Sequence, residues 1–206
     1  MIEASRINLI TPALVDVEAF LPTLAAALDA APIACLRIRM GEPSEDALRR
    51  AADLIRPVAH DRDVAVTLTD HFLIAPAHGL DGVHLSDARL SIRDARKSVG
   101  DDGIVGVFAG TSRHDGMNAA EAGADYVAFG PVAETALGDG KVAGPELFTW
   151  WAEMIETPVV AEGGVTEAQI AGLAPHADFV SLDEAIWTAA EGPAEAIRRI
   201  AALLAD

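Results

Sequence analysis

The sequence predicts a single (β/α)8 barrel that spans residues 1–206, for three reasons. Eight short apolar runs recur along the chain, and Ala-rich stretches with the period of an amphipathic helix separate them. Eight strand–helix units in about 200 residues match the smallest form of this fold. The runs are nearly continuously apolar, as in parallel strands that are buried on both faces.

The apolar runs define the expected strands, and the stretches between them define the expected helices. By residue number the strands are 6–11, 33–39, 64–69, 81–86, 103–108, 124–130, 157–164 and 177–182. The clearest helices are expected at 44–60, 113–123, 166–174 and 192–206. Ser44 is a natural N-cap for the first of these helices. A doubly wound open sheet is the alternative fold, but the segment after the first strand, "LITPALVD", lacks its G-x-G-x-x-G turn.

The chain is strongly acidic, with 32 Asp and Glu against 15 Lys and Arg and a formal net charge of -17. Long-range repulsion disfavours nucleic acid and anionic membranes as partners. The sequence contains no run of about 18 uncharged apolar residues, so it predicts no transmembrane helix. The single cysteine, Cys35, and the absence of a basic segment before the first apolar run favour a cytoplasmic location.

Two arginines alternate with apolar residues in the second strand, "LRIR" at 36–39. If the apolar pair packs under the helices, Arg37 and Arg39 both point into the barrel. They could form buried ion pairs with carboxylates such as Asp70 or Glu162. They could instead bind a phosphate group through the bidentate guanidinium. We favour the second interpretation and predict that both arginines are catalytic.

Polar side chains also follow the third and fourth strands. Asp70 is expected either to cap the next helix or to coordinate Mg²⁺ between substrate phosphates, and we predict it as a catalytic and metal-binding residue. Asp87 lies on the same rim and could complete that metal site, or cap the helix that starts near Ser91. His84 is expected to point inward as a substrate-binding candidate, although a lone inward histidine is more often a satisfied core group.

Small residues follow the sixth, seventh and eighth strands. Gly163 and Gly164 expose backbone N–H groups, and Ser181 lies at the end of the neighbouring strand. The loops after strands seven and eight are the recurrent phosphate site of (β/α)8 barrels, so we predict one here. Thr135, in the loop after the sixth strand, is a further candidate for phosphate binding.

Five motifs resemble one known family, thiamine-phosphate synthase with its relative thiazole tautomerase. They are "INLITP", "LRIR", "DGVHLSD", "AGADYVAFGPV" and "PVVAEGGV", and the likeness covers nearly the whole chain. The resemblance implies a barrel that couples hydroxymethylpyrimidine pyrophosphate to thiazole phosphate and releases pyrophosphate, with Mg²⁺. The pyrimidine is thought to ionise to a carbocation, so catalysis would be mainly electrostatic. A small phosphorylated substrate is implied, and a homodimer is a possible assembly.

The resemblance is partial at the positions that bind pyrophosphate and metal. The chain keeps the family's arginine as Arg37, has Arg39 in place of its lysine, and keeps its first metal aspartate as Asp70. The second metal aspartate is replaced by Arg89, so Asp87 could substitute only if the loop shifts. Other positions where family polar groups are lost are Phe108, Gly110, Leu137 and Gly138.

These departures leave two main functional hypotheses. The first is a synthase whose pyrophosphate and metal end is eroded, while Gly163, Gly164 and Ser181 still serve the thiazole phosphate. The second is a catalytically impaired relative that binds a phosphorylated thiamine-pathway ligand or a partner without turnover. A different phosphate-using barrel, such as an isomerase with Asp70 and His84 as its pair, ranks last.

An aromatic cluster lies in "ELFTWWAEMIE", at Phe148, Trp150, Trp151 and Met154. Its helical spacing favours a face that packs on the barrel over a subunit interface.

Overall fold

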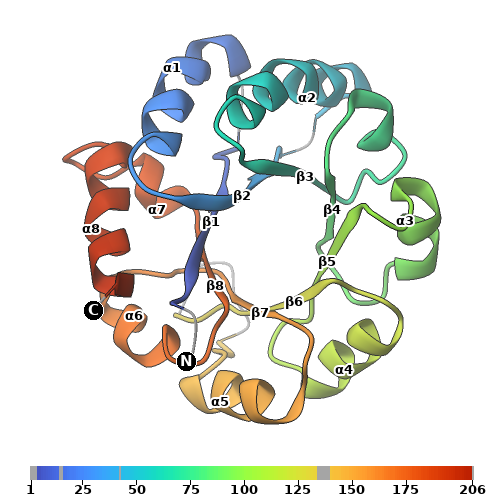
Figure 1. Ribbon diagram of the computed structural model, residues 1–206, viewed down its shortest axis with the longest axis vertical. Helices are drawn as coiled ribbons and strands as arrows, with labels where there is room; N and C mark the ends of the chain where they lie inside the picture. Colours follow the sequence, from blue (N-terminus) through green and yellow to red (C-terminus); the bar gives the residue numbers. More distant parts are fainter. Residues whose placement is uncertain (1–3, 14–15, 42, 134–139, 206) are drawn as a thin grey trace.

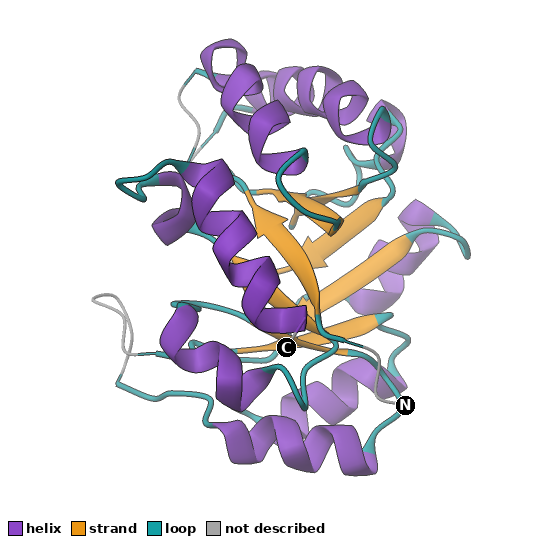
Figure 2. Cartoon of the chain, turned by 60° about the vertical axis from the view of Figure 1, so that its left-hand side comes forward, coloured by secondary structure: helices purple, strands orange, loops and turns teal. Residues whose placement is uncertain are grey.

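The computed structural model describes residues 4–13, 16–41, 43–133 and 140–205 of the chain. Eight parallel strands close into a barrel in the order β1 to β8, and helices surround it (Figures 1 and 2). The strands are β1 Arg6–Ile10, β2 Ile33–Ile38, β3 Ala65–Thr69, β4 Gly82–Leu85, β5 Ile104–Phe108, β6 Tyr126–Phe129, β7 Val159–Ala161 and β8 Phe179–Leu182. The predicted (β/α)8 fold is therefore confirmed.

The helices follow the strands along the chain, and their caps explain where several of them begin. They are α1 Val17–Leu28, α2 Glu45–His60, α3 Ile92–Val99, α4 Arg113–Glu121, α5 Pro145–Met154, α6 Glu167–Leu173, α7 Glu184–Trp187 and α8 Pro193–Ala205, with a short 3₁₀ turn η1 at Pro76–His78. Ser44 caps α2 as predicted, because its side chain accepts from the Ala47 amide. None of the described helices is long and apolar enough to cross a bilayer.

The apolar core lies between the barrel and the helices, whereas the barrel interior is polar. Leu36, Ile38 and Leu68 point outward and are fully buried under the helices. The buried polar residues of the strands are Asn8, Arg37, Thr67, His84 and Ser181. Buried polar groups cost stability unless they are paired, so these residues indicate a functional role near the carboxyl ends of the strands.

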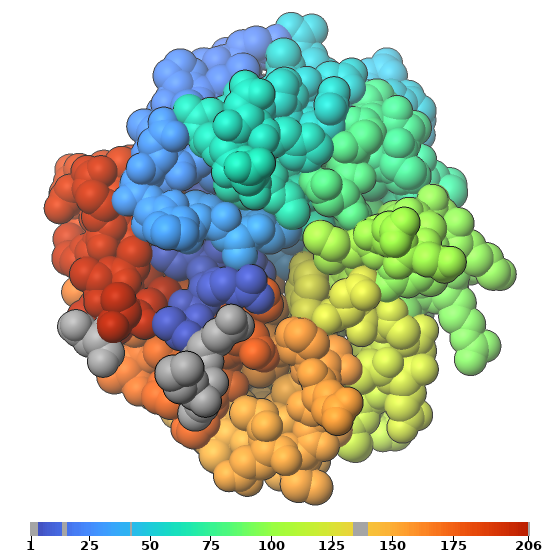
Figure 3. All heavy atoms as spheres, viewed as in Figure 1, coloured from blue at the N-terminus to red at the C-terminus, as the bar shows by residue number. Residues whose placement is uncertain are grey.

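The barrel closes where the first strand meets the last. Residues from Arg6 to Leu9 in β1 pair in parallel with residues from Phe179 to Leu182 in β8. Trp187 fastens this seam from α7, since its Nε1 donates to the Ile10 carbonyl at 2.7 Å and its ring packs edge-on against Phe20. In Figure 3 the blue N-terminal segment accordingly lies beside the red C-terminal segment.

Three aspartates fasten the N-terminal ends of the strands. They directly precede β4, β6 and β8. The carboxylate of each accepts a hydrogen bond from a backbone N–H near the start of the neighbouring strand, β3, β5 or β7. The pairs are Asp81 with Val66 at 2.7 Å, Asp125 with Val105 at 2.6 Å and Asp178 with Val159 at 2.7 Å. The amide of each aspartate donates in return to the carbonyl of the same valine. These pairs satisfy backbone groups that the strand ladder leaves open.

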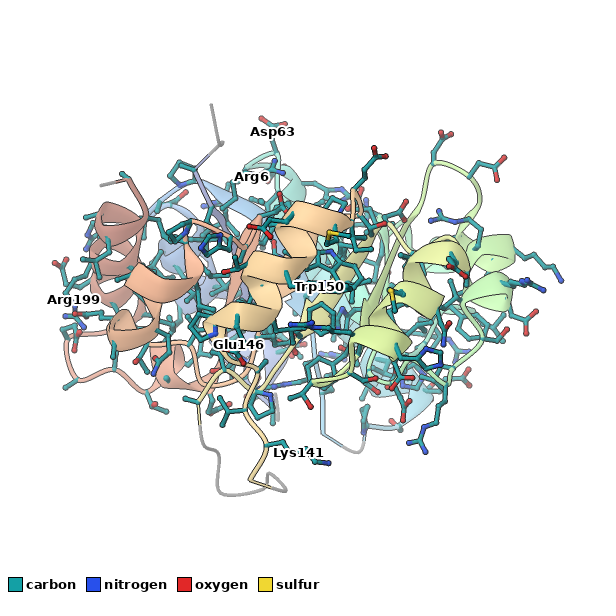
Figure 4. All side chains as sticks on the ribbon, turned by 90° about the horizontal axis from the view of Figure 1, so that it is seen from below. Arg6, Asp63, Lys141, Glu146, Trp150 and Arg199 are labelled. Carbon is teal, nitrogen blue, oxygen red and sulfur yellow. The ribbon has the colours of Figure 1, made fainter. Side chains whose placement is uncertain are left out.

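The aromatic cluster of α5 divides between the core and the surface. Phe148 and Trp151 are fully buried, which confirms the predicted packed face for these two residues. Met154 is 64% exposed, so the expectation is wrong for this side chain, which lies at the end of the helix. Trp150, labelled in Figure 4, is partly buried, and the Arg113 guanidinium stacks on its ring. Trp151 Nε1 donates to the Thr157 carbonyl at 2.7 Å.

Candidate active site

The candidate site is the end of the barrel where the carboxyl ends of the strands meet. In (β/α)8 enzymes the loops that follow the strands form the active site at this end. Figure 4 shows Asp63, which precedes β3, at one end of the molecule and Lys141, which follows β6, at the other. We call the end that contains the loops after the strands the mouth.

Arg37 lies inside the barrel below the mouth, in a buried ion pair. Its Nη2 is 2.5 Å from Oε1 of Glu162, and the two side chains are 8% and 14% exposed. Burial opposes ionisation of Glu162, but the Arg37 guanidinium beside it holds the pKa of that carboxyl below its usual range. The first of the two interpretations of Arg37, an ion pair inside the barrel, is therefore realised, with Glu162 as the partner.

Arg39 occupies a different position, on the rim of the mouth. Its backbone is fixed to the end of β1, because Thr11 Oγ1 accepts from the Arg39 amide and donates to its carbonyl, both at 3.0 Å. Its half-exposed guanidinium is 3.9 Å from Oε2 of Glu184, at the start of α7. Only one of the two arginines can thus meet a ligand from solvent without rearrangement. Glu184 was not considered from the sequence alone.

Asp70 is held rigidly at the end of β3. Its backbone has a positive φ of 62°, which is uncommon for a residue other than glycine. Its carboxylate accepts from both the amide and the hydroxyl of Ser86, at 2.7 and 2.6 Å. The side chain therefore joins the ends of β3 and β4 and does not cap a helix. A strained, pre-oriented carboxylate at a strand end is a common feature of functional sites.

Asp87 pairs with Arg89 two residues along the same loop. The Arg89 amide and Nε both donate to the carboxylate at 2.9 Å, and Nη2 contacts it as well. These hydrogen bonds lower the pKa of Asp87 to about 2. Asp87 also does not cap α3, because Ser91 performs that role. The charge of Asp87 is thus compensated locally by the residue that replaces the family's second metal aspartate.

These carboxylates fit a magnesium ion only in a minimal way. No group of three or more His, Cys, Asp or Glu side chains in the described part of the chain is arranged to hold a metal. Mg²⁺ can be bound by one or two carboxylates together with substrate phosphates and water. Asp70 meets this requirement, since each of its oxygens retains a lone pair beyond the bond to Ser86.

His84 points inward as predicted and is a paired core group. It is 1% exposed, and its Nδ1 lies 2.9 Å from the Tyr126 hydroxyl. Burial, with a smaller effect of Arg37, lowers the pKa of His84 to about 3, so the ring is neutral at physiological pH. Tyr126 reaches it across β5, where a Cβ on Gly106 would lie 2.0 Å from Cζ of the tyrosine. Its place in the strand alternation of "ADYVAFG" could have revealed this inward tyrosine.

The glycine pair after β7 lies against the exit of β6. Gly163 and Gly164 have positive φ angles of 80° and 77°. A Cβ on Gly163 would be 3.1 Å from Cα of Pro131, and one on Gly164 would be 3.2 Å from Cβ of Ala133. The Val132 amide donates to the Gly163 carbonyl at 2.8 Å. Only glycine combines this conformation with such close approach at low cost.

Of the two remaining predicted phosphate ligands, the structure describes Ser181 alone. Ser181 is 2% exposed and lies inside the barrel, where it lines a cavity of about 10 Å³ together with Asn8, Arg37 and Thr67. Thr135, together with Leu137 and Gly138, lies outside the described residues. The roles of Ser181 and Thr135 in binding phosphate therefore stay predictions.

Comparison with known proteins agrees with this architecture. The family model described as thiamine monophosphate synthase matches residues 7–186. A thiamine-phosphate synthase from Rhodospirillum centenum is 45% identical over 93% of this chain and 94% of its own, and one from Hyphomonas neptunium is 35% identical over 97% and 93%. Among solved structures, thiamine phosphate pyrophosphorylase from Pyrococcus furiosus superposes with a TM-score of 0.84 at 22% identity and covers 97% of this chain and 95% of its own.

The sequence relatives cover almost the full length of the chain, and the solved structure has the same closed barrel. The relatives act in thiamine biosynthesis, which agrees with the resemblance of the five motifs. The chain therefore belongs to the thiamine monophosphate synthase family.

Proposed function

We propose that this protein is a thiamine-phosphate synthase that couples hydroxymethylpyrimidine pyrophosphate to thiazole phosphate and releases pyrophosphate. The proposal rests on family membership and on one observation at the mouth. Arg39 and Asp70 follow neighbouring strands, β2 and β3, so a guanidinium and a fixed carboxylate belong to the same rim of the barrel. A pyrophosphate with a bound metal ion requires this combination of groups.

Electrostatic stabilisation is the main contribution that the protein makes to this reaction. The bond between the pyrimidine methylene carbon and the pyrophosphate oxygen breaks, and its electron pair leaves on pyrophosphate. The thiazole nitrogen lone pair then forms the new carbon–nitrogen bond. Arg39 would stabilise the charge that develops on the leaving oxygen. Asp70 would hold Mg²⁺, which when bound neutralises pyrophosphate charge. The N–H groups around Gly163 and Gly164 would orient the thiazole phosphate.

A coupling assay tests this function directly. The purified protein is incubated with both thiamine precursors and Mg²⁺, and thiamine phosphate and pyrophosphate are measured. We expect equal amounts of both products, and chelation of Mg²⁺ should abolish them. The absence of product above background at high enzyme concentration would contradict the proposal.

A second candidate is a family member that binds the ligands without efficient turnover. Two observations favour it: Glu162 compensates Arg37, and Arg89 compensates Asp87, so two charged groups of the family's pyrophosphate end are engaged within the protein. Calorimetric binding of thiazole phosphate that is independent of Mg²⁺, without product in the coupling assay, would support this alternative.

Assembly and location belong to the same proposal. A homodimer and a cytoplasmic location are supported by the family resemblance, and the latter also by the single thiol of Cys35. Light scattering coupled to size exclusion tests the dimer, because a monomeric mass at micromolar concentration would exclude a stable one.

A further inference from the structure

The buried pair of Arg37 and Glu162 is poorly supported by its surroundings. Each partner has a buried polar atom with no hydrogen-bond partner among the described residues, Nε of Arg37 and Oε2 of Glu162, and the same holds for Oδ1 of Asn8 in the barrel interior. A buried ion pair offsets its desolvation only when further hydrogen bonds satisfy both groups. The pair is therefore a weak source of stability, and its charges call for another explanation.

Glu162 links the interior to the mouth. It directly precedes Gly163 and Gly164, and its carboxylate interacts electrostatically with Arg37 inside the barrel and with Arg39 on the rim. Charges in such a buried, low-dielectric place act on one another over several ångströms. A change in the net charge of the pair must therefore be felt by an anion bound at the rim.

The pair removes one positive charge from the floor of the mouth. Without Glu162, the guanidinium of Arg37 would add its full charge to that of Arg39, and both would attract pyrophosphate. With Glu162 ionised, the pair is close to neutral, and Arg39 on the rim still supplies positive charge to the ligand. Tight binding of a released anion slows turnover, so lower affinity for pyrophosphate favours product release.

Building on the proposed function, we propose that Glu162 is a specificity-determining residue that keeps the affinity of the mouth for the leaving pyrophosphate low. It does so by cancelling the charge of Arg37, without touching the reacting atoms. The charge balance between these two side chains, and not the presence of either one, sets how strongly the site holds the anion.

Two single variants test this charge balance with opposite signs. Glu162→Gln keeps the shape of the side chain and leaves Arg37 uncompensated, so inorganic pyrophosphate should bind about tenfold more tightly. Arg37→Gln leaves Glu162 uncompensated and should weaken binding by about the same factor. The double variant restores neutrality and should return the dissociation constant to that of the wild-type protein. Isothermal titration with inorganic pyrophosphate, with and without Mg²⁺, gives these constants.

Asp29→Asn is the matched control for the change in net charge. Asp29 ends α1 at the opposite end of the barrel and pairs with Arg62 at 2.7 Å. Its substitution removes the same formal charge from an arginine pair far from the mouth, so the affinity for pyrophosphate should not change. Thermal melting of every variant confirms that each one is folded, and each single variant tests the proposal without the other.

Several outcomes would overturn the proposal. The first is equal affinity for pyrophosphate in the wild type and both single variants. The second is no measurable binding of pyrophosphate by Glu162→Gln. The third is a double variant that binds pyrophosphate as tightly as Glu162→Gln. A purely structural role predicts a lower melting temperature with no tightening. The coupling assay on the same preparations separates the two proposals. If product forms but the affinities for pyrophosphate do not shift, only the role of Glu162 is refuted. If the affinities shift but no product forms, only the synthase function is refuted.

Discussion

The two ends of the barrel use their carboxylates differently. At the N-terminal end, Asp81, Asp125 and Asp178 each accept from a backbone N–H near the start of a strand. At the mouth, Glu162 is instead held by the side chain of Arg37, and Asp87 by the side chain and the loop amide of Arg89. The difference follows from the direction of parallel strands. Their starts leave N–H donors open, which carboxylates satisfy, whereas their ends leave carbonyls, which carboxylates cannot.

This comparison separates stability from chemistry. Carboxylates that bind the backbone fix strands in place, and their loss should lower stability first. Carboxylates at the mouth bind side chains and loop amides and not the starts of strands, and their loss should change activity first. Four sets of variants test that division, and they follow in decreasing order of expected effect.

The largest effect is expected for Asp70→Asn at the mouth. Loss of the charge that would hold the metal should lower kcat in the coupling assay about 100-fold or more. Asn tolerates a positive φ and keeps one oxygen for the Ser86 amide, so the melting temperature should fall only modestly. Asp63→Asn is the matched control, because Asp63 also has a positive φ, of 56°, but lies at the other end of the barrel (Figure 4). Equal kcat losses in the two variants would contradict the division.

The second effect is a loss of stability at the N-terminal end. Asp125→Ala removes the acceptor of the Val105 amide and the partner of Arg96. Hydrogen bonds to charged groups contribute about 1.5–3 kcal/mol, so the free energy of unfolding should fall by about 2 kcal/mol. Urea denaturation measures this change, and Asp125→Asn should lose less because it keeps one oxygen. A reduced kcat in the folded variant would argue against a purely structural role.

The third effect compares two glycines with similar φ angles. Gly163 has φ 80° against the exit of β6, whereas Gly100, between α3 and β5, has φ 83° and no heavy atom within 4 Å of the position that a Cβ would take. Both Ala variants carry backbone strain of about 1 kcal/mol or more. Only Gly163→Ala should also raise KM for thiazole phosphate, by about tenfold, since the loop must shift away from Pro131. A similar KM for both variants would remove the glycine pair from the site.

The smallest effect is expected for Arg89→Ala, which breaks an exposed ion pair. The free energy of unfolding should change little at neutral pH, because solvent screens such pairs. The folded-state pKa of Asp87, lowered to about 2 by Arg89, should return toward its ordinary value of 3.8. The pair stabilises the fold above that ordinary value, and the contribution is lost as the pH falls from about 4 to about 2. Acid denaturation should therefore differ between variant and wild type only in this range.

The fold was predictable from the sequence, because it depends on local patterns. Every observed strand lies within a predicted apolar run, and Ser44 and Ser91 begin helices where expected. A strand buried on both faces needs only a short run of apolar residues, and such a run can be recognised without knowledge of its neighbours.

The pairing within the site was less predictable. Arg37 and Glu162 are 125 residues apart, and only closure of the barrel selects Glu162 over Asp70 as the partner. The stagger of the strands likewise decides that Ser181 is buried inside. The Asp87–Arg89 pair, two residues apart, and the aspartates just before β4, β6 and β8 are local patterns that the sequence does contain.

Two of the tryptophans make the two ends of the barrel visible separately. Trp187 donates to the last residue of β1, near the mouth, whereas Trp151 donates to Thr157, just before β7 begins at the opposite end. Each indole is thus an intrinsic optical probe of one end. In the double variant Trp150→Phe, Trp151→Phe, fluorescence would follow ligand arrival at the mouth, and in Trp187→Phe it would follow loosening of the strand starts at the other end.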